Sequence, residues 1–314
     1  MNEPLPNDMK IVSEKIYRID DSRPSALVVH PGEEFVVKLQ NAFGRSFRSV
    51  KDFETFFLPR NELLKKRVGH PCTGPIEVET KEKNISLAVH VVDTKVTKAY
   101  QCLSKSTGFL RDRFEARACE IYPIEPGNRV VVGGGDLRLR THPKIGFVST
   151  FDSESRSCGR ASKNGGNLDL NFLDKGSIIY LPVNASKARF LIGDLHACQG
   201  NGEAAGIAIE ADGEVTLCVE IVDKINFPII DDKIRMIVVG YGETLEECAR
   251  VATENSMIFL ARIFPFCDWS EERIYKFISA EGNLVIGNGS GTIKTCGMVF
   301  YKGRMYNAHD LPIF

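Results

Sequence analysis

The sequence predicts a mainly β protein, with a β-sandwich or jelly-roll-like body and a smaller C-terminal α/β portion. The whole chain would then belong to the α+β class. Two observations carry this prediction. Short runs of alternating apolar residues, separated by turn residues, recur through residues 1–232 and are typical of strands. Near residue 233 the pattern changes, and two segments with helical periodicity appear among strands. We therefore predict two domains, residues 1–232 carrying the functional site and residues 233–314 forming the smaller α/β unit.

The first strands lie close to the N-terminus. Apolar runs at residues 26–30 and 35–39 flank Pro31-Gly32, and a Pro-Gly pair between strand formers predicts a hairpin. The aromatic segment at residues 47–67 is locally helical and predicts a loop or short helix packed over the sheet. Apolar residues alternate at residues 85–91, which predicts a half-buried strand.

Glycines mark three further features of the central region. Residues 133–135 are all glycine, but a strand pattern follows them and no Lys-Ser/Thr pair does, so they predict a hairpin or bulge rather than a phosphate-binding loop. A polar, Gly/Ser-rich loop at residues 152–166 is long enough to suggest a functional role. Asp212-Gly213 stands between two alternating runs, and Asp-Gly predicts another hairpin.

The C-terminal portion contains the clearest helix. Thr244 and Glu247 have the spacing of a capping box, with the threonine as N-cap. An apolar stripe begins at Leu245, is interrupted at Ser256 and includes small residues that suit packing against a sheet. A second helix is predicted to begin at Ser270, because acidic residues in its first turn favour a helix N-terminus.

Composition and charge exclude several classes of protein. The 40 basic and 41 acidic residues nearly cancel and form no basic tract, so we expect no nucleic-acid partner. No apolar span of about 18 residues occurs, and the N-terminus lacks the apolar core of a signal peptide, so we expect neither membrane insertion nor secretion. The nine cysteines include no CxxC pair, which predicts reduced thiols in a cytoplasmic protein rather than a disulfide framework or zinc cluster.

The densest group of polar residues is GDLHACQGNGE at residues 193–203, directly after the apolar run at residues 190–192. That run predicts a strand, and alternation along it would place Asp194 and His196 on one face. A carboxylate oxygen and an imidazole nitrogen can together hold a divalent metal. The alternative is a tight polar turn in which both side chains bind backbone groups.

A second polar pair stands upstream of this stretch. GGNLD at residues 165–169 ends the long loop, and its glycines would let the backbone come close to a bound group. Asp169 is a candidate oxygen ligand. An Asx-rich turn before the next strand is the alternative.

Together these motifs resemble the acetamidase/formamidase family. The resemblance rests on GGNLD (165–169), YLPV (180–183), GDLHACQGNGE (193–203) and GIAIE (206–210), in this order and spacing. It extends more weakly to TGPIEVE (73–79) and to the C-terminal helices, and so covers most of the chain. It implies a hydrolase of small linear amides such as formamide or acetamide, which releases ammonia and a carboxylate. We also expect a homo-oligomer, as a dimer.

Amide hydrolysis needs an activated water and a polarised carbonyl, and a divalent metal can supply both. We expect Asp194 and His196 to be metal ligands, with Asp169 as the third. Zinc is the first candidate because it accepts nitrogen and oxygen ligands, and calcium or manganese are the alternatives.

The remaining polar residues of the motifs receive roles in binding and proton transfer. Glu203 is the predicted acid/base, since a carboxylate can carry the proton from water to the leaving nitrogen. Gln199 or Asn167 would orient the amide, and Gly165 and Gly166 would line the substrate site beside Asn167. A hydrogen-bond acceptor for loop amides is the alternative role of Glu203, and Glu210 is expected to be a structural or supporting residue.

Three residues depart from the family pattern. Asn201 stands in a turn that usually reads GDGE, Cys198 replaces a small residue, and His70 precedes the TGP turn where asparagine is more usual. These departures leave open a different substrate, such as a lactam, or a non-catalytic protein that binds a metal or small ligand. A further alternative makes Cys198 the nucleophile, with His196 or Glu203 as base.

Overall fold

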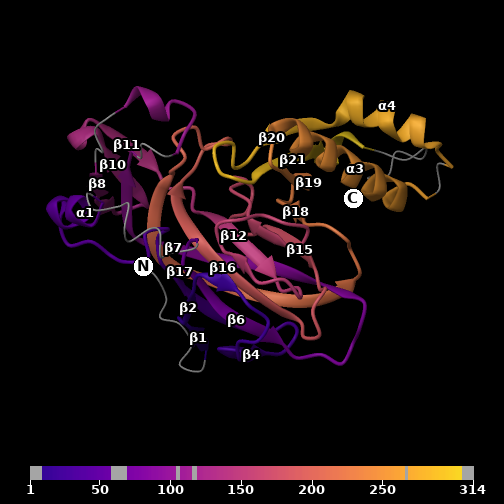
Figure 1. Cartoon of the computed structure of the whole chain (residues 1–314), viewed down its shortest axis with the longest axis horizontal. Coiled ribbons are helices and arrows are strands. Elements are labelled where there is room, and N and C mark those ends of the chain that lie inside the picture. Colours follow the sequence, from indigo (N-terminus) through magenta and orange to yellow (C-terminus); the bar gives the residue numbers. More distant parts are fainter. Residues whose placement is uncertain (1–8, 58–68, 104–106, 115–118, 266–267, 306–314) are drawn as a thin grey trace.

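The computed structural model describes residues 9–57, 69–103, 107–114, 119–265 and 268–305, and one large, mostly antiparallel sheet dominates it (Figure 1). This 16-stranded sheet confirms the predicted mainly β class. Its strands are β1 (Lys10–Val12), β2 (Lys15–Ile16), β4 (Leu27–Val29), β5 (Glu34–Leu39), β6 (Cys72–Val78), β7 (Ile85–Cys102), β8 (Cys119–Tyr122), β12 (Lys144–Thr150), β14 (Gly165–Asn167), β15 (Ile178–Pro182), β16 (Arg189–Cys198), β17 (Ile209–Asp223), β18 (Ile229–Asp231), β19 (Arg235–Gly242), β20 (Asn283–Ile286) and β21 (Lys294–Tyr301).

Smaller sheets and a few helices complete the described elements. One three-stranded sheet comprises β9 (Ile124–Glu125), β10 (Arg129–Val132) and β11 (Leu137–Arg140), and β3 (Arg18–Ile19) pairs with β13 (Arg156–Ser157). The α-helices are α1 (Val50–Phe57), α3 (Leu245–Ile263) and α4 (Glu271–Glu281). Single 3₁₀ turns lie at η2 (Arg111–Arg113), η3 (Gly133–Gly135) and η4 (Lys302–Arg304).

The strand that carries the predicted site changes its partner along its length. β16 pairs with β12 on one side. On its other side, Gly193 pairs with Cys72 of β6, whereas His196 pairs with Glu210 of β17. Asp194 therefore lies at a fork between two neighbouring strands. This fork brings residues of β6, β16 and β17 together.

The C-terminal strands β18, β19, β21 and β20 extend the same sheet, and α3 and α4 cover them with a separate apolar cluster (Figure 1). Thr244 caps α3 by accepting a hydrogen bond from the Glu247 N–H, as predicted. Ser256, which interrupts the apolar stripe, is buried and donates to the Ala252 carbonyl. Both predicted helices are confirmed. The domain boundary near residue 233 stays a prediction, and β18 pairs with β19 across it.

Two predicted hairpins are wrong. β4 pairs with β6, and β5 pairs with β1 and β17, so Pro31-Gly32 joins two strands that do not pair with each other. Asp212-Gly213 is part of the continuous strand β17, where the register against β7 shifts between these two residues. Glycine suits this irregularity because a Cβ at Gly213 would lie 2.2 Å from the Lys95 carbonyl oxygen.

Other local predictions are confirmed. The three glycines of η3 join β10 and β11 as a hairpin. The aromatic segment at residues 47–67 contains the short helix α1, which packs near β8, and its residues 58–67 lie outside the described part of the chain. Among the described helices, none has the length and apolar character needed to cross a membrane.

Candidate metal centre and active site

Three acidic residues of the predicted site have an unusual backbone conformation. Asp169, Asp194 and Glu203 have φ angles of 48°, 58° and 38°, in the left-handed region that residues other than glycine rarely enter. Such conformations cost on the order of 1–3 kcal/mol each and persist only where the surrounding structure requires them. Their concentration in one set of neighbouring carboxylates indicates a functional site.

The predicted pair of Asp194 and His196 meets in space. His196 Nε2 lies 3.4 Å from Asp194 Oδ1 and 3.5 Å from Glu210 Oε1. All three side chains are buried. Glu210 lies beside His196 because these two residues are partners where β17 pairs with the second half of β16.

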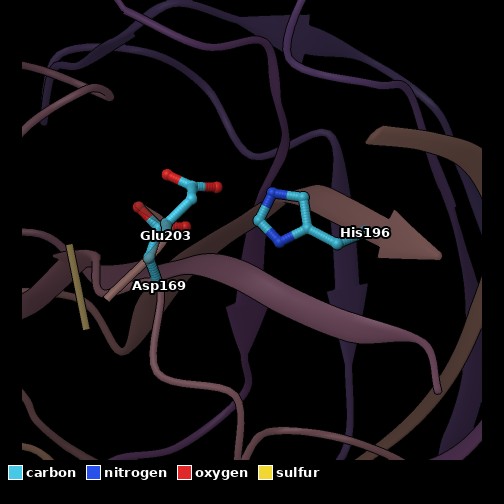
Figure 2. A group of neighbouring side chains, drawn as sticks. All are labelled: Asp169, His196 and Glu203. Carbon is cyan, nitrogen blue, oxygen red and sulfur yellow. The ribbon is translucent and has the colours of Figure 1, made fainter. Parts of the chain in front are cut away.

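His196 belongs to two groups of possible metal ligands. One group joins it to Asp194 and Glu210 and the other to Asp169 and Glu203, and within each group the ligand atoms lie within 4.8 Å of one another. Figure 2 shows the Asp169 and Glu203 carboxylates side by side and next to the imidazole of His196. One imidazole and four carboxylates form a nitrogen and oxygen donor set that suits a divalent metal.

A glycine leaves open the space that these side chains surround. Gly146 of β12 lies opposite Asp194 in the register of β12 and β16. A Cβ at Gly146 would lie 2.6 Å from Asp169 Oδ1, 2.7 Å from Asp194 Oδ2 and 2.8 Å from His196 Cε1. Two carboxylate oxygens and the Cε1 edge of an imidazole therefore surround one point beside this glycine.

Four buried polar atoms at the site have no hydrogen-bond partner among the described residues: Asn167 Oδ1, Asp194 Oδ1, His196 Nδ1 and Gln199 Oε1. A buried polar atom left unpaired costs about 1–3 kcal/mol, so such atoms normally bind something. The aspartate and histidine atoms suit a cation. The two amide oxygens are acceptors and suit an N–H donor.

Side-chain amides hold Asp169 in place. Asn167 and Asn288 donate to its Oδ2 at 2.6 and 2.9 Å, and Gln199 donates to its Oδ1 at 3.2 Å. The Gln199 amide also donates to Glu203 Oε1 at 3.3 Å. Gln199 thus links the candidate ligand Asp169 to the candidate acid/base. Supporting contacts of this kind orient metal ligands in many sites.

Burial and mutual repulsion raise the pKa of three of the carboxyl groups. Burial, followed by the charge of Asp194, raises the pKa of Asp169 to about 6. Burial raises the pKa of Glu210 to about 8, although His196 opposes this shift and Asp194 adds to it. Burial, together with the charge of Asp169, raises the pKa of Glu203 well above its ordinary value. A carboxyl group with a raised pKa can donate a proton near neutral pH.

The surroundings of the fourth carboxyl group and of the imidazole instead favour their charged forms. Burial disfavours the Asp194 carboxylate, but His70 and His196 outweigh it and lower the pKa of Asp194. Burial likewise disfavours the imidazolium, but Asp194 and Glu210 raise the pKa of His196 well above its usual range. Without a metal, Asp194 and His196 therefore form a buried ion pair. A metal ion would take the place of the imidazolium proton.

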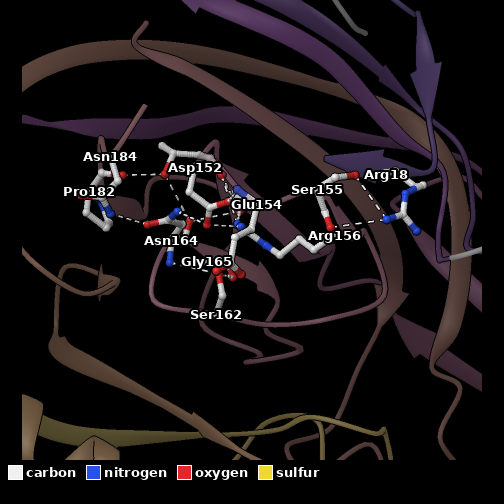
Figure 3. A network of polar contacts seen from close by, with 12 residues as sticks. Arg18, Asp152, Glu154, Ser155, Arg156, Ser162, Asn164, Gly165, Pro182 and Asn184 are labelled. Carbon is white, nitrogen blue, oxygen red and sulfur yellow. Dashed lines mark hydrogen bonds and ion pairs between the residues drawn. The ribbon is translucent and has the colours of Figure 1, made fainter. Parts of the chain in front are cut away.

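A network of polar contacts orders the long loop that leads to the site (Figure 3). Arg156 pairs with Asp152, and Asn164 donates to the same carboxylate at 2.6 Å. Ser162 donates to the carbonyl of Gly165 at 3.3 Å. The loop predicted to be functional is thus tied to the sheet directly before Asn167.

The glycines at the end of this loop approach the protein's own backbone. Gly165 and Gly166 have φ angles of 96° and 125°. A Cβ at Gly165 would lie 2.3 Å from the Val148 carbonyl oxygen, and a Cβ at Gly166 would lie 2.2 Å from the Arg160 carbonyl oxygen. Among the described residues, Asn167 lines the cavity and these two glycines do not. The glycines therefore position Asn167 rather than coming close to a bound group, which differs from the prediction.

The carboxylates open into a cavity of about 360 Å³. His70 lines it, with Nδ1 3.7 Å from Asp194 Oδ1. Cys198 does not reach it: its Sγ contacts the Arg140 carbonyl at 3.6 Å, and burial raises the pKa of this thiol. His142 lines a different cleft. This geometry gives no support to Cys198 as a nucleophile.

Three residues of the site carry roles that the sequence analysis did not assign. The sequence predicts a structural or supporting role for Glu210, yet this residue faces His196. Its position as the charged residue that ends the apolar GIAIE motif could have indicated a role in the site. Gly146 and Asn288 left no such indication, because their roles depend on which strands and loops meet in the fold.

Comparisons with known proteins point to one family. The profile of the Acetamidase/Formamidase family matches residues 155–299, which include every predicted site residue. A protein of Schizosaccharomyces pombe, named as a candidate formamidase, is 44% identical over 71 residues. That match spans 22% of this chain and 17% of the other protein.

Solved structures extend the likeness to nearly the whole chain. An acetamidase from Bacillus halodurans is 26% identical, with a TM-score of 0.82 over 94% of this chain and 98% of its own. A predicted acetamidase/formamidase from Thermoanaerobacter tengcongensis is also 26% identical, with a TM-score of 0.83 over 93% and 96% of the two chains. The resemblance predicted from the motifs is confirmed, and with it the class of enzyme, an amidase.

Proposed function

We propose that this chain, which resembles the acetamidase/formamidase family, hydrolyses the carbon–nitrogen bond of small linear amides, with a divalent metal at the site. The observation that carries this proposal is the point beside Gly146, which Asp169, Asp194 and His196 surround. On two of these side chains, Asp194 Oδ1 and His196 Nδ1 are buried without a hydrogen-bond partner among the described residues. These residues fit a metal ion.

The proposed ligands are Asp169, Asp194 and His196, with Glu210 beside them. Zinc suits one nitrogen and several oxygens, and manganese or calcium are the alternatives. When bound, such an ion supplies Lewis-acid polarisation of the amide carbonyl and lowers the pKa of water.

The protein's own groups bind the amide and move the proton. Asn167 lines the cavity with an unpartnered Oδ1, which can accept an N–H of the substrate and so fix the amide plane. Glu203 also lines the cavity, and its raised pKa suits a group that takes a proton from water and returns it to the leaving nitrogen. Gln199 holds Glu203 beside Asp169.

The test combines metal content with ammonia release. We expect the wild type to bind about one zinc per chain, measured by plasma emission spectroscopy, and to release ammonia from formamide or acetamide. His196→Ala should lose both properties, whereas Glu203→Gln should keep the metal and lose turnover. His90→Ala, in a histidine paired with Glu220 outside the cavity, is the matched control and should change neither. Full activity in His196→Ala or in metal-stripped protein would contradict the proposal.

Metal binding without release of ammonia from any amide or lactam would instead support a non-catalytic binding protein. We also propose that the protein is cytoplasmic and forms a dimer. Light scattering coupled to size exclusion would test the dimer.

A further inference from the structure

The cavity is larger than the simplest amides require. An amide such as acetamide occupies on the order of 100 Å³, at the roughly 30 Å³ that a molecule the size of water takes in a liquid. The cavity holds about 360 Å³. That volume falls within the range of about 300–1,000 Å³ that is typical of sites for larger organic ligands. Formamide or acetamide would leave most of this space to water.

Part of the cavity lining is apolar. Phe43, Phe56 and Ile207, which we call the acyl wall, all line the cavity. They belong to a largely aromatic cluster to which α1 contributes Phe53 and Phe56, and in which the ring centres of Phe43 and Phe53 lie 5.0 Å apart. An apolar group that displaces water from such a surface gains binding free energy in proportion to the area covered.

Polar contacts behind the acyl wall hold it in place. The Phe43 N–H donates to Asn41 Oδ1 at 3.0 Å, and the Asn41 side-chain amide donates to the buried Asp212 at 2.6 Å. The guanidinium of Arg45 lies 5.5 Å from the centre of the Phe56 ring. The wall is therefore formed before a ligand arrives, which reduces the entropy lost on binding.

The acyl wall begins directly beside the carboxylates. The Ala42 N–H, adjacent to Phe43, donates to Glu210 Oε2 at 3.1 Å. Ile207 precedes Glu210 on the approach to β17. A substrate whose carbonyl carbon lies at the carboxylate cluster would therefore extend its acyl chain over Ile207 toward the two phenylalanines.

We infer that the substrates are primary amides with a bulky apolar acyl group, held by the acyl wall. This inference rests on the proposed amide hydrolysis. Asn167 Oδ1, which has no hydrogen-bond partner among the described residues, can accept a hydrogen bond from an N–H of the amide group. In the reaction, the oxygen of water forms the new bond to the acyl carbon and the carbon–nitrogen bond breaks. The leaving nitrogen takes a proton, so the products are ammonia and an apolar carboxylic acid.

The experiment compares acetamide, butyramide, hexanamide and benzamide as substrates of the metal-loaded protein, by ammonia release. We expect kcat/KM to rise roughly fourfold or more for each methylene that contacts the wall. Phe56→Ala, in a partly exposed ring, should lower the ratio of kcat/KM for hexanamide to that for acetamide by about tenfold. Ile207→Phe should also lower this ratio, because the larger side chain would fill the space beside the acyl wall that the hexanamide chain needs.

Phe47→Leu is the matched control, since Phe47 lies in the same aromatic cluster but not among the described cavity-lining residues. It should leave the ratio unchanged. Calorimetric binding of hexanamide and acetamide to Glu203→Gln provides a second readout that needs no turnover.

The outcomes separate this inference from the proposed function. Fastest turnover of formamide and acetamide, with no tighter binding of hexanamide, would overturn the inference and leave amide hydrolysis standing. Tighter binding of hexanamide without turnover of any amide by the wild type would overturn the proposed function and keep the acyl wall. A hexanamide preference that Phe56→Ala and Ile207→Phe do not alter would overturn the assignment to these residues.

Discussion

Two buried carboxylates on the same strand have very different surroundings. Asp212 accepts hydrogen bonds from the backbone and side chain of Asn41, from Ser46 and from Tyr100. Glu210, two residues earlier on β17, accepts one from the Ala42 N–H and otherwise faces His196 and Asp194. Protein donors satisfy the first carboxylate, whereas the second shares its space with other ionisable groups.

The contrast distinguishes a structural carboxylate from a functional one. Complete pairing makes a buried charge tolerable and fixes the surrounding chain, as at Asp212, which anchors the segment before Phe43. The cluster around His196 instead combines left-handed backbone, raised pKa values and unpartnered atoms. These features cost stability in the absence of a ligand. A bound cation would offset them.

The largest expected effect is the loss of activity on substitution of Asp194, one of the functional carboxylates. Asp194→Ala should lower kcat/KM by about a thousandfold or more, because it removes a proposed ligand. In metal-stripped protein it should also lower the free energy of unfolding by about 3 kcal/mol, because it leaves the buried His196 imidazolium without its carboxylate partner. Ammonia assays and urea denaturation measure the two effects. A large loss of stability without loss of activity would make Asp194 a structural residue.

Asp212→Ala should lower stability without removing the metal site. It leaves the donors of Asn41, Ser46 and Tyr100 without their shared acceptor, which should reduce the free energy of unfolding by about 3 kcal/mol. The folded fraction should still bind zinc. Urea midpoints with and without zinc test this prediction, and loss of zinc binding in fully folded protein would break the comparison.

Gly146→Ala tests the space inside the cluster. Its Cβ would meet Asp169, Asp194 and His196 at less than 3 Å, so we expect zinc affinity to fall by about 10–100-fold. Gly146 has no positive φ angle, so the substitution adds no left-handed backbone strain. Gly303→Ala in η4 is the control, since no atom of the described residues beyond its chain neighbours lies within 4 Å of its Cβ and Gly303 has no positive φ angle. Unchanged zinc affinity in Gly146→Ala would show that no ion occupies this point.

The smallest expected effect is a pH dependence. Asp169 and Glu210 have pKa values raised to about 6 and about 8, and both must lose their protons before they can bind a metal. Their raised pKa values also mean that metal-free protein loses stability as pH rises from about 5 to about 8. Zinc should therefore raise the melting temperature more at pH 8 than at pH 6. Differential scanning fluorimetry measures this difference, and an equal increase at both pH values would contradict it.

Local patterns predicted much of the fold and part of the site. The capped helices α3 and α4 and the strand β16 follow from periodicity and short-range hydrogen bonds, which neighbouring residues set among themselves. Asp194 and His196 are two residues apart, so their meeting also depends on local geometry. The errors arose where two structures share one local pattern. Asp212-Gly213 fits a turn or a bulge, and only the pairing of the long strand β7 with β17 decides between them.

The sequence by itself determined the fold class, the family and the residues that bring carboxylate, amide and imidazole groups into one segment, because composition and spacing encode them directly. Only the tertiary structure decided that β16 changes partner at Asp194, that Glu210 faces His196, and that Gly146 keeps the centre open. These features depend on strand register and on the approach of distant segments. Contacts between segments far apart in the chain produce no periodic pattern in the sequence from which they could be predicted.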